Sequence, residues 1–415
     1  MEYTEKKPQI EKAVLVSVDT GDFDAEVSID ELASLAETAG AVVVASVIQR
    51  RERPEAATFV GLGKLSEIKT CCEMNDADLL IFDTELSPSQ QRNIETLTGV
   101  HTIDRTTLIL DIFALRARSS EGRLQVELAQ LKYTLPRLGG QGTKLSRLGG
   151  GIGTRGPGET KLESDRRHIR RRIQHLEQEL QQIEKRRKML RERRKKDGVQ
   201  TVAIVGYTNA GKSTLMNALT DAGVLAENKL FATLDPTARA LTLPDGRNVV
   251  LIDTVGLIRR LPHRLVEAFK STLEVAVDAS VILNVCDASD ENCAQHLEVT
   301  RQLLEELGCT GKPIVSVMNK CDLAGDVYSL RTFGKTVMIS ALEKKGIDTL
   351  LEAIVNELPP TRMTVEILIP FSHGAVAAEI RKDGAVHEEE YREDGLYMRA
   401  TVEISFADKY KDWLL

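Results

Sequence analysis

The chain has 415 residues, of which 42% are hydrophobic and 28% charged, and its formal net charge is −7. This length exceeds what one hydrophobic core usually organises, so several domains are expected, and the acidic balance excludes a protein that is basic throughout. The six cysteines lack C-x-x-C spacing, the first thirty residues lack a signal-like apolar segment, and every apolar run is too short for a membrane span. We therefore expect a soluble, cytoplasmic protein without a disulfide scaffold or a zinc site.

The first predicted domain covers residues 1–103. Three short apolar runs have the composition of strands: 13–18, 41–48 and 79–82. Two stretches between them are helix-like: 28–39 and 63–74. The alternation predicts an α/β domain with a mostly parallel sheet. Gly61–Lys64 opens the second helix, and its glycines form either an ordinary turn or a weak phosphate site.

Residues 104–197 are predicted to form an antiparallel helical hairpin. A first apolar stripe recurs at helical spacing: Leu124, Leu128, Leu131 and Leu135. A second follows a heptad seam: Leu162, Ile169, Ile173, Leu176, Leu180, Ile183 and Leu190. Because each stripe can bury the other, the two helices should pack side by side.

The connection between these helices, residues 137–158, is rich in glycine and arginine. It holds nine of the chain's 29 glycines, four basic residues and no acid. Arg137, Lys144, Arg147 and Arg155 are expected to contact phosphates. Residues 161–197 add fifteen Lys/Arg against seven Asp/Glu. A solvated helix face is the alternative interpretation, but such a local excess in an acidic protein favours contact with an RNA backbone, without base stacking on aromatic rings.

Residues 198–360 are predicted to form a P-loop domain. The strand 201–205 leads into the motif G-x-x-x-x-G-K-S, and a helix follows, which is the context that this motif requires. Backbone N–H groups at the helix start would bind the β-phosphate, Lys212 would bridge the β- and γ-phosphates, and Ser213 would bind Mg²⁺. The predicted nucleotide-binding residues here are Gly206, Tyr207, Thr208, Asn209, Ala210, Gly211, Lys212, Ser213 and Thr214. Asn209 shapes the loop and is also the candidate ligand of a monovalent cation.

Three further motifs, each following a predicted strand, indicate GTP/GDP as the nucleotide. In the first, a carboxylate can hold Mg²⁺ through water and the Gly256 amide can bond the γ-phosphate: Asp253, Thr254, Val255 and Gly256. In the second, Asp322 matches the two donors of guanine but not the donor pattern of adenine: Asn319, Lys320 and Asp322. In the third, a backbone amide can meet guanine O6: Ser340, Ala341 and Leu342.

A loop between the phosphate loop and the first of these motifs completes the predicted site: Phe231, Ala232, Thr233, Leu234 and Asp235. Thr233 is expected to close over Mg²⁺ and the γ-phosphate. The predicted catalytic residues are Lys212, Thr233 and Gly256, and the predicted metal ligands are Ser213 and Thr233. Leu257 stands where many small GTPases carry a water-orienting glutamine, which predicts slow intrinsic hydrolysis that a partner stimulates. Arg259 and Arg260 are expected at the surface.

The last predicted domain, residues 361–415, is a small α+β module. A strand (365–369) and a helix (374–382) precede two extended stretches (385–392 and 396–406). Eleven acidic and seven basic residues give it an acidic balance, which is more typical of a protein partner than of a nucleic-acid partner.

Several of these motifs together resemble the Obg–HflX branch of translation-factor (TRAFAC) GTPases: GYTNAGKST, KLFATLDPT, DTVG followed by an apolar residue, and NKCD. GTRGPGETKLE (153–163) resembles the signature of the HflX family, and the resemblance covers nearly the whole chain. It implies binding to the large (50S) ribosomal subunit, GTP hydrolysis stimulated by that subunit, and splitting of stalled ribosomes under stress. It also implies that residues 137–158 reach toward the peptidyl-transferase region of the ribosome. A further implication is ATP use by the N-terminal region, for which Gly61–Lys64 is the candidate site.

Two other functions remain open from the sequence. One is an RNA-binding ribosome-assembly factor that uses GTP as a structural switch with little turnover. The other is a regulator peripheral to membranes, against which the scarcity of bulky aromatics on the basic helix argues. We expect a monomer with no DNA partner.

Overall fold

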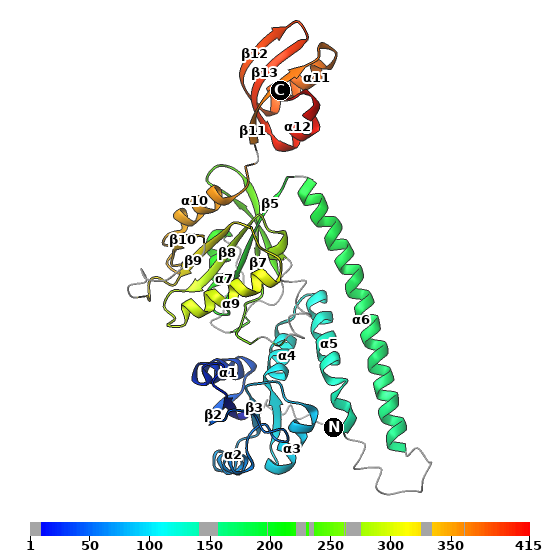
Figure 1. Ribbon diagram of the computed structural model, residues 1–415, viewed down its shortest axis with the longest axis vertical. Coiled ribbons are helices and arrows are strands. Elements are labelled where there is room, and N and C mark those ends of the chain that lie inside the picture. Colours follow the sequence, from blue (N-terminus) through cyan, green and yellow to red (C-terminus); the bar gives the residue numbers. More distant parts are fainter. Residues whose placement is uncertain are drawn as a thin grey trace, which may run out of the picture.

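The computed structural model describes residues 10–140, 157–196, 198–220, 230–231, 236–260, 262, 275–324, 334–360 and 362–415. Three separate sheets and a long helical hairpin organise these residues, as Figure 1 shows. The predicted multidomain α/β fold with a mostly parallel P-loop sheet is confirmed. Among the described residues, no helix combines the length and apolarity of a membrane span.

The N-terminal sheet is parallel, in the order β2-β1-β3-β4. Its strands are β1 (Lys12–Asp19), β2 (Val42–Arg50), β3 (Leu79–Phe82) and β4 (His101–Asp104). Its helices are α1 (Ala25–Ala39), α2 (Leu62–Asn75), α3 (Pro88–Thr98) and α4 (Arg105–Arg116). Alternate residues of β1 enter separate cores, Leu15 with residues of α1 and α4, and Val16 with residues of α2 and α3. The sheet is therefore covered on both faces.

The hairpin consists of α5 (Ser120–Thr134), the short turn η1 (Arg137–Gly140) and α6 (Pro157–Lys196). At about 1.5 Å per residue, the 40 residues of α6 span about 60 Å. The helix runs alongside α5 and continues to the P-loop domain (Figure 1). The heptad prediction is wrong at its end, where Leu190 is 58% exposed, because α5 is much shorter than α6.

The most buried residues of α5 are not its leucines. They lie on the face toward the N-terminal core and include Val126, Ala129 and Tyr133. The leucine stripe is only partly buried. Cross-helix ion pairs join Arg172 to Glu127 (2.7 Å) and Arg187 to Glu121 (2.8 Å). Those two arginines therefore serve the hairpin rather than a free basic surface.

The P-loop domain has a six-stranded sheet in the order β10-β9-β8-β5-β7-β6, parallel except for β6. Its strands are β5 (Gln200–Gly206), β6 (Thr237–Thr242), β7 (Asn248–Asp253), β8 (Val281–Asp287), β9 (Ile314–Asn319) and β10 (Lys335–Met338). Its helices include α7 (Lys212–Thr220), α9 (Cys293–Glu306) and α10 (Ile347–Glu357). The predicted motifs follow β5, β7, β9 and β10, so the parallel order gathers them at one edge of the sheet.

The C-terminal module has an antiparallel sheet in the order β11-β13-β12, packed on its own apolar cluster. Its elements are β11 (Arg362–Ile369), η3 (Phe371–His373), α11 (Gly374–Asp383), β12 (Ala385–Arg392), β13 (Gly395–Glu403), α12 (Ile404–Lys409) and η4 (Lys411–Trp413). The expected extended stretch to residue 406 is too long, because a helix begins at Ile404. The module lies beyond the P-loop domain, at the end opposite the N-terminal sheet (Figure 1).

Candidate nucleotide site

The phosphate loop depends on two glycines whose backbones admit no side chain. Gly206 has φ +147°, and a Cβ built on it would lie 2.1 Å from the carbonyl oxygen of Val285. Gly211 has φ +89°, and its Cβ would lie 2.2 Å from Nδ2 of Asn319. The sequence motif therefore corresponds here to real steric limits, which bring the loop against β8 and β9.

Lys212 begins α7, and its amine is buried under the loop. Its Nζ donates to the carbonyl oxygens of Gly206 (3.1 Å) and Tyr207 (2.7 Å). Burial lowers the pKa of Lys212 to about 8, and the Asp253 carboxylate opposes that shift. A Cβ on Gly256 would lie 3.0 Å from this Nζ. The structure thus places two predicted catalytic residues, Lys212 and Gly256, next to each other.

Ser213 and Asp253 form the oxygen-rich part of the site. The Ser213 hydroxyl donates to Oδ2 of Asp253 at 2.9 Å, and Asp253 is fully buried at the end of β7. Hydroxyl and carboxylate oxygens are ligands that Mg²⁺ accepts, so this pair fits the predicted metal. The other predicted ligand, Thr233, lies outside the described residues, as do Ala232, Leu234 and Asp235.

Asn319 acts as a brace between two motifs. Its Nδ2 donates to the Ala210 carbonyl (2.9 Å), and its Oδ1 accepts from the Ala341 amide (2.9 Å). A backbone amide of residues 340–342 was expected to meet guanine O6, and among these amides that of Ala341 bonds to protein in this structure. Ser340 is buried and its Oγ accepts from Glu343, whereas Leu342 is exposed.

The remaining residues of the guanine motif differ in their surroundings. Lys320 adopts φ +62° and its Nζ pairs with Asp287 at 2.6 Å, so it holds the loop after β8. Asp322 is exposed, as a carboxylate that receives a base must be.

Several other residues of the predicted site bond or pack within the protein and so hold the loops around the nucleotide site in place. The Thr254 hydroxyl donates to Ile204 at 2.8 Å and joins β7 to β5. Val255 lies in the apolar cluster of the N-terminal domain, and buried Leu257 bonds Gly206 and Thr208 through its backbone. Asn209 has φ +59°, consistent with shaping the turn.

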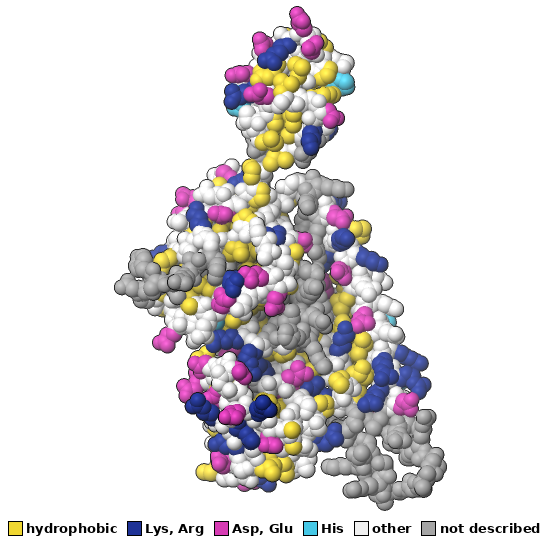
Figure 2. Space-filling view, in the orientation of Figure 1, with side chains coloured by type: hydrophobic (Ala, Val, Ile, Leu, Met, Phe, Trp, Pro, Cys, Tyr) yellow, Lys and Arg dark blue, Asp and Glu magenta, His cyan; other side chains and the backbone are white. Residues whose placement is uncertain are grey.

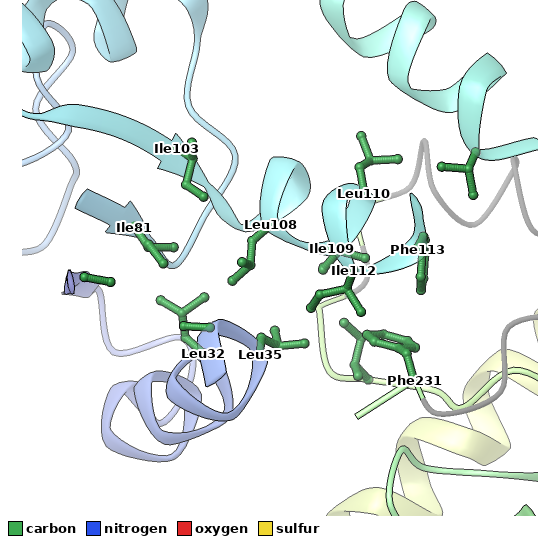
Figure 3. Packing of buried hydrophobic residues seen from close by; sticks show 14 of the residues in the cluster. Leu32, Leu35, Ile81, Ile103, Leu108, Ile109, Leu110, Ile112, Phe113 and Phe231 are labelled. Atoms are coloured by element: carbon green, nitrogen blue, oxygen red, sulfur yellow. The ribbon is translucent and has the colours of Figure 1, made fainter. Parts of the chain in front are cut away.

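The N-terminal domain packs against this site, which the sequence did not indicate. Phe231, expected beside the nucleotide, is buried instead against Phe113 of α4, with ring centroids 4.7 Å apart in an edge-to-face arrangement. Figure 3 shows Phe231 meeting the side chains of α4 near Ile112 and Phe113. The Phe231 side chain therefore serves the contact between domains, and the predicted nucleotide contact of this residue stays a prediction for its backbone.

Tyr207 links the phosphate loop to the N-terminal domain. Its hydroxyl bonds to Glu31 of α1 and accepts from the Arg259 amide at 2.6 Å. Its ring stacks on His296 at 3.8 Å. Burial, followed by the Glu31 charge, raises the pKa of Tyr207, so the hydroxyl stays protonated and can donate to the carboxylate.

A buried ionic network continues from Glu31. Arg105, at the start of α4, contacts Glu31 (2.7 Å) and Asp83 (2.8 Å), and Arg260 contacts Asp83 (3.1 Å). Arg105 also donates to the Arg259 carbonyl at 3.0 Å. Burial disfavours the charged guanidinium of Arg105, but the two carboxylates outweigh it and raise its pKa. Arg260 is exposed and Arg259 is partly exposed, as expected, but both also join the interface with the N-terminal domain.

Two groups outside the P-loop are engaged within the protein: Arg137, which was expected to contact phosphate, and Gly61–Lys64, where a weak phosphate site was one alternative. Arg137 donates to the Leu86 carbonyl (2.7 Å) and pairs with Asp104 (3.4 Å), so it fixes the start of the Gly/Arg-rich segment instead of presenting its charge. The Gly61 amide donates to Gln49, and Lys64 pairs with Glu67. Lys144, Arg147 and Arg155 lie outside the described residues.

Three family models match successive parts of the chain. Residues 26–114 match the family described as GTP-binding GTPase N-terminal, 116–194 its middle region, and 201–320 the family described as 50S ribosome-binding GTPase. A GTPase HflX from Caldanaerobacter subterraneus is 50% identical over 98% of this chain and 94% of its own, and that of Escherichia coli is 43% identical over 93% and 92%. A GTP-binding protein of Sulfolobus solfataricus, solved with GDP, is 28% identical over 84% of this chain and 98% of its own, with a TM-score of 0.44.

Proposed function

The chain belongs to the HflX family of GTPases, and from this premise we propose that it binds the large ribosomal subunit and couples GTP binding and hydrolysis to the splitting or rescue of ribosomes under stress. The observation that supports this most directly is the match of residues 201–320 to a 50S ribosome-binding GTPase family. A basic hairpin beside that domain supplies a surface suited to ribosomal RNA.

The RNA contact is proposed for the end of α6 nearest Pro157. Arg167, Arg170 and Arg171 are exposed there, and Figure 2 shows Lys and Arg side chains gathered on this part of the helix. Arg172 beside them is paired with Glu127, so it is excluded from the proposed contact. Exposed guanidinium groups on a long helix can neutralise RNA phosphates without reading sequence.

We assign a role in binding GTP and Mg²⁺ to each of the following residues. The phosphate loop and Lys212 bind the phosphates, and Ser213, Asp253 and Thr233 would hold Mg²⁺, which neutralises phosphate charge when bound. The Gly256 amide bonds the γ-phosphate while GTP is present and loses that bond after hydrolysis. Asn209 remains the candidate for a monovalent cation.

In this proposal, the loss of the γ-phosphate changes the position of the N-terminal domain. Gly256 is followed by Leu257, Ile258, Arg259 and Arg260, and the last two contact Arg105 and Asp83. A displacement of Gly256 therefore alters the docking of the N-terminal domain and the hairpin that extends from it. Buried Leu257 supplies no polar group to orient water, which is consistent with slow intrinsic turnover that the ribosome stimulates.

GTP turnover should be measured alone and with 30S, 50S and 70S particles. The tip variant replaces Arg167, Arg170 and Arg171 with alanine, and a matched control replaces three exposed basic residues farther along the same helix: Lys185, Arg186 and Lys188. We expect 50S and 70S particles to stimulate GTP turnover, and this stimulation should be weaker in the tip variant. In a binding measurement, the slope of the logarithm of the binding constant against the logarithm of salt concentration should fall by about one for each lost phosphate contact. Equal loss in both variants would contradict the proposed location.

Light scattering by 70S particles separates splitting from the assembly-factor alternative. Splitting predicts a GTP-dependent fall in scattering when the protein is added. Binding to 50S particles with neither stimulated turnover nor splitting would support the assembly factor, and binding to no particle would remove the ribosome as partner while leaving the GTPase intact.

A further inference from the structure

Two thiols face each other between β8 and α9, outside the groups that bind nucleotide. Cys286 lies one residue before the end of β8, and Cys293 is the first residue of α9. Their Sγ atoms are 2.7 Å apart, and both side chains are buried. A disulfide brings the two sulfurs to about 2.05 Å. Closing the pair therefore requires a shift of well under about 1 Å.

The two cysteines belong to a small buried cluster that is separate from the other hydrophobic clusters. Leu297 of α9 and Met318 of β9 complete its buried part, and Cys321 of the guanine motif lies at its edge. Cys321 is tied separately, with its thiol 3.1 Å from the Met318 carbonyl. The geometry therefore pairs Cys286 specifically with Cys293.

The connection between the two cysteines is bonded to the guanine motif. Asp287 pairs with Lys320 at 2.6 Å, and the Ala288 amide donates to the Asn319 carbonyl at 2.8 Å. Asp290 also lies 3.6 Å from His296, whose ring stacks on Tyr207 of the phosphate loop. A constraint on residues 287–292 is thereby passed to both sides of the nucleotide site.

From this arrangement we propose that Cys286 and Cys293 form a redox-modifiable pair, which a hydroperoxide closes to a reversible disulfide that slows nucleotide release. The inference rests on membership of the GTPase family and not on the ribosomal role. Cross-linking removes open conformations of the β8–α9 connection. Since Asn319 and Lys320 are bonded to that connection, loosening of the guanine motif becomes less frequent.

The chemistry balances with the hydroperoxide as the oxidant. The Cys293 thiol loses its proton, the thiolate attacks one peroxide oxygen, and the O–O bond breaks to leave a sulfenic acid and an alkoxide (hydroxide, for hydrogen peroxide). The leaving oxygen takes up the proton that Cys293 lost and becomes an alcohol (or water). The Cys286 sulfur then attacks the sulfenic sulfur, the S–O bond breaks, and water leaves with the Cys286 proton. Two thiols are oxidised by two electrons while the peroxide is reduced.

The local environment assigns the two roles. Donation from the Cys286 thiol lowers the pKa of Cys293, and the same contact followed by burial raises the pKa of Cys286. Cys293 also stands at the amino end of a helix, which favours a thiolate. Because both sulfurs are buried, the oxidant reaches them when the connection opens locally. Bound nucleotide, which holds Asn319 and Lys320, should slow the oxidation.

The test uses the full chain, nucleotide-free and loaded with GDP, treated with hydrogen peroxide and mapped by mass spectrometry of non-reduced peptides. We expect one link, Cys286–Cys293, that forms faster without nucleotide and opens with dithiothreitol. Release of a fluorescent GDP analogue should slow by roughly fivefold after oxidation and recover after reduction. Because each comparison uses the same wild-type preparation, it does not depend on how well variants fold.

Variants sharpen the assignment. Cys321→Ser should still form the link, whereas Cys286→Ser and Cys293→Ser should neither form it nor show slower release after oxidation. A link to Cys321, oxidation without any disulfide, or unchanged or faster release from the linked protein would overturn the proposal.

Discussion

The P-loop domain meets its two neighbouring domains in very different ways. Toward the N-terminal domain it presents Phe231, Tyr207 and Arg260, all in contact with α1, α4 or Asp83. Toward the C-terminal module, the described bonds run to the linker, where Gln200 and Arg247 donate to the Pro359 carbonyl. Among the described residues, the contacts of the phosphate loop with a neighbouring domain run to the N-terminal domain and not to the C-terminal module. A change of nucleotide can therefore reach the N-terminal domain and its hairpin directly, but not the C-terminal module.

The largest expected effect is the loss of stability when an ion pair at the N-terminal interface is removed, compared with the loss of one in the C-terminal module. In Arg105→Met, Glu31 and Asp83 lose their shared buried cation, which should lower the free energy of unfolding by about 3–5 kcal/mol. The matched control is Arg381→Met, whose partner Glu389 lies on the surface of the C-terminal module, and it should leave the urea midpoint nearly unchanged. Equal losses in both variants would break the contrast.

A smaller effect is expected at the phosphate loop. Tyr207→Phe keeps the ring on His296 but removes the hydroxyl that bonds Glu31 and the Arg259 amide, which should cost about 1–3 kcal/mol of unfolding free energy. Tyr391→Phe in the C-terminal module alters an exposed hydroxyl and should have no measurable effect. Denaturant unfolding checks both, and an unaltered Tyr207→Phe protein would mean that the interface does not depend on this residue.

The buried amine of Lys212 predicts proton uptake on GTP binding. Its pKa of about 8 in the free protein means that it is mostly neutral at pH 9, and phosphate oxygens favour its charged form. Binding should therefore take up about 0.9 proton at pH 9 and about 0.1 at pH 7. Calorimetry in buffers of different ionisation enthalpy measures this, and apparent enthalpies independent of buffer at pH 9 would contradict it.

The smallest expected effect follows from removing residues 362–415. The apolar cluster of this module contains none of the residues that form the other clusters, and its connection to the P-loop domain is a short linker. Basal GTP turnover should stay within about twofold of the full chain in a steady-state phosphate-release assay. A larger change would show that this module also acts on the nucleotide site.

The sequence by itself determined the chemistry that is local in the chain. Gly206, Lys212 and Ser213 lie within eight residues, so their motif predicted the loop, whereas the steric limits at its glycines come from Val285 and Asn319. The strands that carry Asp253 and Asn319 were also predictable, because a parallel sheet gathers their carboxyl ends at one edge. The heptad spacing of α6 likewise predicted its helix, though not where its partner helix stops.

Only the tertiary structure decided which side chains remained available. Arg137 was expected to meet phosphates but pairs with Asp104, and Arg260, exposed as expected, also pairs with Asp83. Phe231 turned from the predicted nucleotide loop toward Phe113. In each case the partner lies tens or more than a hundred residues away. The free energy of burying a ring or pairing a charge depends on that distant partner, which no local pattern specifies.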